Sequence, residues 1–243
     1  FGIGGDGIIL VCPSKVADAK MKMYNLDGSE GKMCGNGIRC VGKFLYDHGM
    51  VDYKEKDEIT IETLSGIKSL KAYTTNGEVT SLRVDMGKAI LDPKEIPVAM
   101  NKDKIVNEPV TIGDKEYNIT CVSMGNPHCV VFMDDIDNLD IEKIGPMFEN
   151  DKLFPERVNT EFVTVLDDHT IKMRVWERGS GETWACGTGA CAVAVAACEN
   201  GFCKKGDDIK IKLKGGDLVI NYTDETVYMT GNAEKVFEGE IEV

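Results

Sequence analysis

The sequence predicts a mixed α/β fold of two pseudo-symmetric halves, each a curved, mostly antiparallel β-sheet wrapped around a central helix. Three observations support this prediction. First, residues 20–37 recur without a gap as residues 172–189. Second, each copy opens with alternating apolar and charged residues, a pattern typical of a strand. Third, each copy ends in Cys-Gly-x-Gly and leads into an apolar segment of helical length. The repeated unit is therefore strand, turn, cysteine, glycine-rich loop and helix.

The two copies read KMKMYNLDGSEGKMCGNG and KMRVWERGSGETWACGTG. After the predicted strand, each passes through a turn rich in glycine and serine. A glutamate, Glu30 or Glu182, then stands four residues before the cysteine, Cys34 or Cys186. Agreement over strand, turn and loop indicates that both halves use the same local architecture.

The second helix, predicted over about 189–199, is apolar on every side, so other elements must enclose it. A glycine follows each helix, Gly49 or Gly201, as is common at helix C-termini. Much of the remaining chain alternates in the manner of strands. The segments concerned are 58–66, 77–87, 129–135, 160–166, 208–222 and 226–243.

Residues 87–117 hold three of the seven prolines and show little periodicity, so we expect the boundary between the halves there. The predicted division is 1–88 for the first half, 89–225 for the second, and 226–243 for a C-terminal strand tail, for which a return to the first half is one option. Asn126 lies 60 residues before Cys186, and a counterpart 60 residues before Cys34 would precede Phe1. We therefore expect the first half to lack its N-terminal strand segment.

The net charge is −13, from 28 basic and 41 acidic residues. Such an excess repels phosphate backbones and anionic membranes, so we expect a small-molecule substrate and neither a nucleic-acid nor a membrane partner. The sequence shows no apolar run of the roughly 18 residues that span a bilayer, and no secretory signal pattern. These features predict a cytoplasmic protein.

The nine cysteines form no Cys-x-x-Cys pair, and an odd number does not suggest a secreted disulfide framework. With only three histidines, a zinc ribbon or another metal site is not indicated. We expect reduced thiols, no metal and no cofactor.

A cysteine at a helix N-terminus lies beside unpaired N–H groups and the positive end of the helix dipole. We therefore expect a thiol pKa below the ordinary value of about 8.5. Neighbouring glycines let a ligand approach the backbone, whose N–H groups can hold a carboxylate. Two such loops facing each other would suit inversion of an amino acid, in which a thiolate removes the α-proton and a thiol delivers a proton to the opposite face.

Two other interpretations of the cysteines remain open at this point. A lone Cys-Gly-x-Gly would more often be a buried structural cysteine beside a tight turn, although the repeat of the whole unit argues against this. Alternatively, Cys34 and Cys186 could form a structural disulfide, which fits poorly with a reducing compartment.

At these residues the sequence closely resembles the diaminopimelate epimerase family, over nearly its whole length. The motifs that carry the resemblance are NLDGSEGKMCGNG, VSMGNPHC, ERVNTEF, WERGSGETWACGTGAC and VYMTG. The resemblance implies two halves, each enclosing a helix, with the active site in the cleft between them. It also implies an isomerase that interconverts LL- and meso-diaminopimelate without a cofactor, in lysine and peptidoglycan-precursor biosynthesis.

The resemblance implies roles for individual residues. Cys34 would be the proton donor and Cys186 the acceptor in the LL-to-meso direction, with the roles exchanged in reverse. His128 and Glu177 would modulate the pKa values of these cysteines, and Tyr228 would lie at the interface of a homodimer. The implied substrate-binding residues are Asn25, Gly35, Asn36, Asn126, Asn159, Glu177, Arg178, Gly187 and Thr188.

Each residue also has a simpler interpretation. The asparagines could be turn residues, and Asn126-Pro127 is a natural turn dipeptide. His128 could be a hydrogen-bonded core histidine, Glu177-Arg178 a solvated strand end, and Tyr228 a packed strand residue. The sequence also lacks the family's N-terminal Gly-x-Gly-Asn-Asp segment. Two rival functions remain: a proline or hydroxyproline racemase, and a thiol-based redox sensor.

Overall fold

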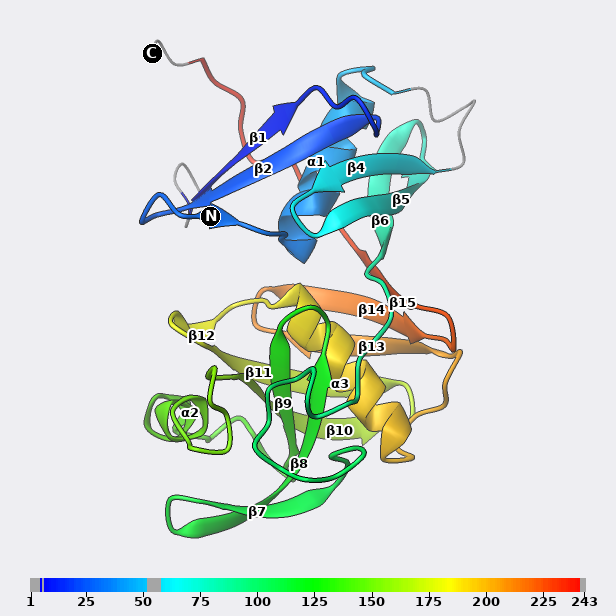
Figure 1. The fold of residues 1–243 in the computed structure, drawn as a ribbon. Coiled ribbons are helices and arrows are strands. Elements are labelled where there is room, and N and C mark those ends of the chain that lie inside the picture. Colours follow the sequence, from blue (N-terminus) through cyan, green and yellow to red (C-terminus); the bar gives the residue numbers. More distant parts are fainter. Residues whose placement is uncertain (1–4, 6, 52–57, 241–243) are drawn as a thin grey trace. The chain divides into compact units, whose positions relative to one another are not determined.

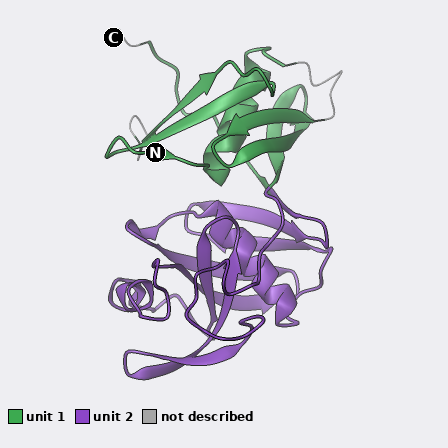
Figure 2. Cartoon of the chain, in the orientation of Figure 1, with its two compact units in different colours: residues 1–85, 230–243 green, residues 86–229 purple. Residues whose placement is uncertain are grey.

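The computed structural model describes residues 5, 7–51 and 58–240. The chain divides into two compact units, residues 1–85 with 230–243 and residues 86–229 (Figure 2). The divisions predicted from the sequence fall after residues 88 and 225. The last residues of the chain thus belong to the same unit as the first.

The first unit is a β-sheet with one helix, α1 (Gly35–Asp47), which contacts β5 and β6 (Figure 1). All neighbouring strands are antiparallel except β2 and β4. The short β3 (Glu30–Gly31) pairs with β2, at the turn that leads to Cys34. The other strands, in spatial order, are β1 (Gly7–Cys12), β2 (Ala19–Asn25), β4 (Ile59–Thr63), β5 (Gly66–Thr75) and β6 (Glu78–Asp85).

The second unit is a larger sheet around α3 (Gly187–Glu199), with parallel pairing only between β9 and β10 and between β11 and β13 among the pairs described. In spatial order its strands are β15 (Val227–Gly231), β14 (Gly216–Tyr222), β13 (Asp208–Leu213), β11 (Thr170–Glu177), β10 (Asn159–Asp167), β9 (Pro127–Phe132), β8 (Lys115–Ser123) and β7 (Glu108–Ile112). A further short strand, β12 (Gly181–Thr183), pairs with β11.

The apolar helix α3 is enclosed as its sequence predicts. Its residues from Ala190 to Ala197 are fully buried, and it contacts five strands of the second unit. Without a polar face, this helix is stable in water only inside such a shell. The predicted fold class, mixed α/β and mostly sheet, is therefore confirmed. Only α3 is fully enclosed among the described helices, since α1 leaves Cys40, Phe44 and Asp47 exposed.

Three details differ from the sequence analysis. The helix predicted from about residue 189 begins at Gly187, because Cys186 itself is the N-cap. The strand predicted over 226–243 ends at Gly231; residues 232–240 have no regular structure, and 241–243 lie outside the described residues. Strands β5, β7 and β8 were not predicted, and residues 87–117 include β7.

The helix α2 (Ile141–Glu149) was also not predicted. It is short and contains Gly145 and Pro146, both poor helix formers. Packing explains the glycine, because a Cβ at this position would lie 2.3 Å from the ring of Trp176. This contact brings α2 onto the end of β11, next to Glu177 and Arg178.

Candidate active site

Cys34 is the N-cap of α1. Its backbone is extended, with φ −128° and ψ 117°, and its carbonyl accepts the N–H of Ile38 at 2.9 Å. Its Sγ accepts the N–H of Gly37 at 3.3 Å, so the sulfur occupies the position of a capping oxygen. The side chain is half-buried and the thiol is free.

Cys186 caps α3 with nearly the same backbone, φ −127° and ψ 109°, and its carbonyl accepts the N–H of Ala190 at 2.9 Å. Its surroundings are different. The residue is only 5% exposed, and its Sγ lies 3.6 Å from the hydroxyl of Thr188. The repeated sequence thus places both sulfurs at helix N-termini in matching local geometry.

The second glycine of each Cys-Gly-x-Gly lies in a crowded position, although the crowding atoms differ between the two copies. A Cβ at Gly189 would lie 3.2 Å from the Cβ and Sγ of Cys186, and 2.6 Å from Oε1 of Glu161. A Cβ at Gly37 would lie 3.4 Å from Cβ and 3.5 Å from Sγ of Cys34. Glycine therefore leaves room for the capping thiol and Glu161 at Gly189. At Gly37 the distances to Cys34 are ordinary contacts, and the close atom is Cδ1 of Ile9 at 2.3 Å.

The expected low pKa is wrong for Cys186. Burial raises the pKa of its thiol well above the ordinary value, and the carboxylates of Glu177 and Glu161 raise it further. The hydrogen bond with Thr188 acts in the opposite direction but does not offset these effects. The thiol has lost its contact with water and lies near two acidic groups, so its protonated form is favoured despite the helix N-terminus.

A chain of hydrogen bonds leads from the core to Cys186. The Oε1 atom of Glu161 lies 2.7 Å from Nδ1 of His128, and both side chains are fully buried. The other ring nitrogen of His128 lies 3.1 Å from Oδ1 of Asn126, whose amide nitrogen donates to Thr188 Oγ1 at 3.3 Å. His128 is thus a hydrogen-bonded core histidine that is connected to Cys186 through Asn126 and Thr188.

Glu161 was not among the predicted site residues. Burial raises its pKa, which the neighbouring His128 acts to lower. Its Oε2 atom is buried without a hydrogen-bond partner among the described residues. The signal in the sequence was a lone glutamate inside the apolar strand segment TEFVTV, because a charged residue seldom lies buried unless it is paired.

Glu177 and Arg178 lie where β11 ends. Glu177 Oε1 accepts the hydroxyl of Thr183 at 2.5 Å. The backbone N–H of Arg178 donates to Asn159 Oδ1 at 3.0 Å, and its guanidinium donates to the carbonyl of Glu156 at 3.0 Å. The Asn159 amide nitrogen donates to the carbonyl of Pro127 at 3.0 Å. In the second unit, the structure therefore brings Asn126, Asn159, Glu177 and Arg178 onto neighbouring strand ends.

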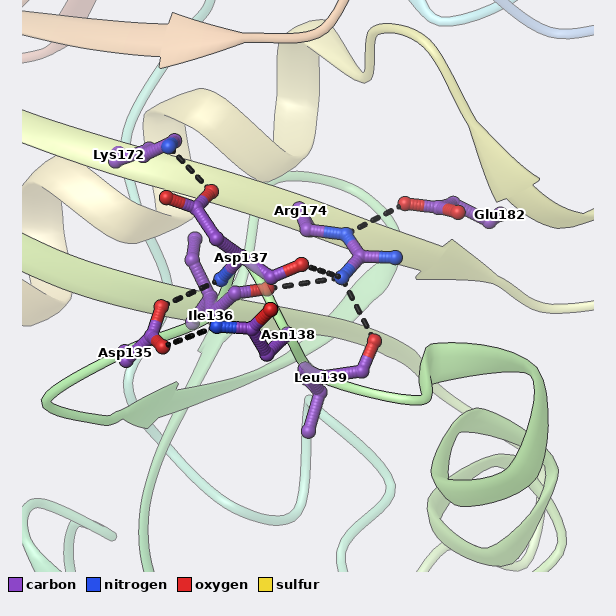
Figure 3. A network of polar contacts seen from close by, with 8 residues as sticks. All are labelled: Asp135, Ile136, Asp137, Asn138, Leu139, Lys172, Arg174 and Glu182. Atoms are coloured by element: carbon purple, nitrogen blue, oxygen red, sulfur yellow. Dashed lines mark hydrogen bonds and ion pairs between the residues drawn. The ribbon is translucent and has the colours of Figure 1, made fainter.

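The turn before Cys186 is fixed by an ionic network. Glu182 accepts from Arg174 Nε at 2.8 Å and pairs with Lys214 at 2.8 Å. Partial burial acts to raise the pKa of Glu182, but these two cations lower it overall. Arg174 also donates to the carbonyls of Ile136 and Leu139, both at 2.8 Å (Figure 3). The glutamate shared by both repeats thus has a structural role in the second unit.

In the first unit, Asn36 follows Gly35 at the start of α1, and its Oδ1 accepts from Arg39 at 3.2 Å. Arg39 is itself 7% exposed and also donates to the carbonyl of Gly35 at 3.0 Å. Arg39 was not predicted, but it holds the Asn36 amide. Asn25 ends β2 in an exposed turn, where its amide donates to Ser29 Oγ at 3.0 Å.

Tyr228 is half-buried on β15. Over the described part of the chain, no group of three or more His, Cys, Asp and Glu side chains is placed to hold a metal ion. Among the helices described, none is long and apolar enough to cross a membrane.

Comparisons with known proteins agree with the resemblance noted from the motifs. The model of the family "Diaminopimelate epimerase" matches residues 1–91 and 120–236. The diaminopimelate epimerase of Agathobacter rectalis is 53% identical over 100% of this chain and 87% of its own length. That of Methanococcus maripaludis is 54% identical, with the same coverage of both chains.

Solved structures with the same fold are more distant in sequence. A probable proline racemase from Agrobacterium radiobacter has a TM-score of 0.68 at 18% identity, covering 93% of this chain and 73% of its own. A Bacillus anthracis phenazine biosynthesis protein of the PhzF family has a TM-score of 0.70 at 17% identity, covering 99% and 86%. These two share the fold alone, whereas the family model and the close relatives show that this chain belongs to the diaminopimelate epimerase family.

Proposed function

We propose that this protein is a cofactor-independent epimerase that interconverts LL- and meso-2,6-diaminopimelate, in lysine and peptidoglycan-precursor biosynthesis. One observation carries the proposal: in a chain of this family, two cysteines cap two helices with the same backbone geometry. Each sulfur lies at a helix N-terminus, where N–H groups favour a bound carboxylate and the negative charge that develops on it as the α-proton leaves.

The reaction needs one proton-transfer group on each face of the α-carbon. In the LL-to-meso direction, the thiolate of Cys186 takes the α-proton, and the electron pair moves toward the substrate carboxylate. Cys34 then gives its thiol proton to the opposite face, so the centre inverts. The products are a thiol at Cys186 and a thiolate at Cys34, and the reverse reaction starts from that state.

The high pKa of Cys186 suggests that Glu177 controls the protonation of this thiol. Without substrate, the carboxylate of Glu177 helps to keep Cys186 protonated. When the ammonium group of the substrate pairs with Glu177, its positive charge offsets that carboxylate, and thiolate at Cys186 becomes less costly. Substrate binding itself would therefore activate the base, with His128 adjusting the same thiol through Asn126 and Thr188.

The remaining proposed roles concern binding. The N-terminal residues of the helices, Gly35 with Asn36 and Gly187 with Thr188, hold the carboxylate at the reacting centre. Diaminopimelate carries a second amino-acid group, which requires a second carboxylate clamp and a second ammonium acceptor. The Arg178 guanidinium suits the carboxylate, and the amides of Asn25, Asn126 and Asn159 can serve either end.

We also propose a cytoplasmic homodimer with Tyr228 at its interface. Sedimentation of the purified protein tests this: Tyr228→Asp should shift a dimer toward monomer. A wild-type monomer at micromolar concentration would contradict the proposed assembly without affecting the proposed chemistry.

The experiment that tests the proposed activity uses full-length protein under reductant in D₂O with LL-diaminopimelate. NMR should show deuterium at an α-carbon together with the meso form, and no exchange with proline. Exchange with proline or hydroxyproline alone would favour a racemase of the rival class. No exchange with any of the three, together with disulfide-dependent behaviour, would favour a thiol sensor.

A further inference from the structure

Glu149 is a buried carboxylate that the proposed mechanism does not use. It is the last residue of α2 and is only 6% exposed. Its Oε2 atom accepts the indole N–H of Trp176 at 2.7 Å, and its Oε1 atom accepts the backbone N–H of Gly179 at 2.9 Å. Arg157 adds a third contact, from Nη1 to Oε1 at 3.1 Å.

These contacts have a particular spacing along the chain. Trp176 immediately precedes Glu177, and Gly179 immediately follows Arg178. One carboxylate thus binds the residues on both sides of the pair that we assign to the substrate. Hydrogen bonds to an ionised group are shorter and stronger than neutral ones, so two of them hold a four-residue turn firmly.

Two glycines, Gly179 and Gly145, allow the turn and α2 to approach each other closely. Gly179 has φ +79°, a left-handed backbone that a glycine adopts freely, and its N–H points at the carboxylate. Gly145 of the same helix lets the Trp176 ring lie against the backbone of α2. The helix therefore packs closely against Trp176 and directs the Glu149 carboxylate at both ends of the turn.

We propose that Glu149 is a positioning residue, which fixes the turn after Glu177 and so holds Arg178 for the carboxylate of the amino-acid group that is not being inverted. This rests on the proposed function, because it takes Arg178 as the carboxylate clamp. Glu149 itself does not touch the substrate. Its loss should weaken substrate binding more than proton transfer, since the cysteines are capped independently of α2 and the Glu177 carboxylate keeps its hydrogen bond from Thr183.

The test compares Glu149→Ala and Glu149→Gln with Glu142→Ala, a change at an exposed glutamate in the first turn of the same helix. Glutamine keeps one oxygen but places an NH₂ group against one of the two N–H donors. We expect KM for diaminopimelate to rise roughly tenfold in Glu149→Gln and more in Glu149→Ala, with kcat changed less than threefold. Glu142→Ala should match wild type.

A second variant, Arg157→Ala, distinguishes the effect of the hydrogen bonds to the turn from that of the Arg157–Glu149 ion pair. Arg157→Ala removes a contact to Glu149 but leaves those to Trp176 and Gly179, so its KM should stay near wild type. Hydrogen exchange of the peptide around residues 176–181, measured without substrate, should be faster in both Glu149 variants and unchanged in Arg157→Ala.

The two measurements distinguish the possible failures. Unchanged exchange at the turn in Glu149→Gln would overturn the inference, as would faster exchange with KM unchanged. If kcat fell and KM did not, Glu149 would act on the chemistry, which also contradicts positioning. A wild-type protein inactive on diaminopimelate would contradict the proposed function. Faster hydrogen exchange in the Glu149 variants would then still support the conclusion that Glu149 fixes the turn.

Discussion

The two cysteine loops share a backbone but not an environment. Cys34 and Cys186 cap their helices with φ and ψ that agree within 1° and 8° (−128°, 117° and −127°, 109°). Cys34 is half-buried and bonds to the N–H of Gly37, whereas Cys186 is buried beside Thr188, Glu161 and Glu177. The repeat therefore provides two equivalent positions for sulfur. The sulfurs differ chemically because Glu177 and Thr188 stand where the first copy has Asn25 and Asn36, and because Glu161, outside the repeat, lies beside Cys186.

The largest effect should follow removal of either sulfur. In Cys34→Ala or Cys186→Ala, one face of the substrate loses its proton-transfer group, so epimerisation should fall by about 10³-fold or more. Chromatographic measurement of meso-diaminopimelate formed from the LL isomer checks this. If the two cysteines act as a pair, both variants should be equally inactive, and full activity in either would contradict the mechanism.

The glycines beside the cysteines should respond differently to the same change. In Gly189→Ala the new Cβ meets Glu161 Oε1 at 2.6 Å and Cys186 at 3.2 Å, so overpacking should lower the free energy of unfolding by about 1–3 kcal/mol. In Gly37→Ala the nearest atom is Cδ1 at the end of the Ile9 side chain, which can move, so the loss should be smaller. Urea unfolding measures both, and an equal or larger loss in Gly37→Ala would show that the loops are packed alike.

The raised pKa of Cys186 predicts how its reactivity depends on pH. Below that pKa the sulfur is a thiol, so alkylation by iodoacetamide should be slow at neutral pH and accelerate only in alkaline solution. Glu177→Gln removes a charge that raises this pKa, so the profile should shift to lower pH. Peptide mass spectrometry follows the modification of Cys186 as a function of pH. Rapid labelling of Cys186 at neutral pH would contradict the buried, protonated state.

The smallest effects are expected at cysteines outside the helix caps. Cys40 is exposed, so Cys40→Ala should change the free energy of unfolding by less than about 0.5 kcal/mol. Cys198 is half-buried, and burial raises its pKa to about 12, so Cys198→Ala should cost about 1 kcal/mol and leave turnover unchanged. A selective loss of catalysis in either variant would mean that a third thiol takes part.

Both helix caps could be predicted because their determinants are local. In each copy of the repeat, the cysteine, the glycines and the helix follow one another directly along the chain. The enclosed α3 was predicted for the same reason, since an all-apolar helix has no other stable position.

Glu161 and Glu149 could not be placed in the site from the sequence, because distant segments bring them there. Glu161 meets His128 only because β9 and β10 pair in parallel, with Asn159 opposite His128. Glu149 reaches the turn after β11 through α2, a helix whose glycine and proline obscure its pattern. The error in the pKa of Cys186 has the same origin, because helix position is local whereas burial and neighbouring carboxylates are tertiary.

The most direct test of the two-cysteine account is the position of solvent deuterium at low conversion. In D₂O, LL-diaminopimelate incubated with wild-type protein should give meso product that carries deuterium at the inverted carbon. The unreacted LL substrate should carry none, because the thiol that removes its α-proton is not the thiol that delivers a deuteron to the opposite face. Mass spectrometry and NMR of the separated isomers provide the measurement. Early deuterium in the recovered LL isomer would indicate a single exchanging base and would contradict the account.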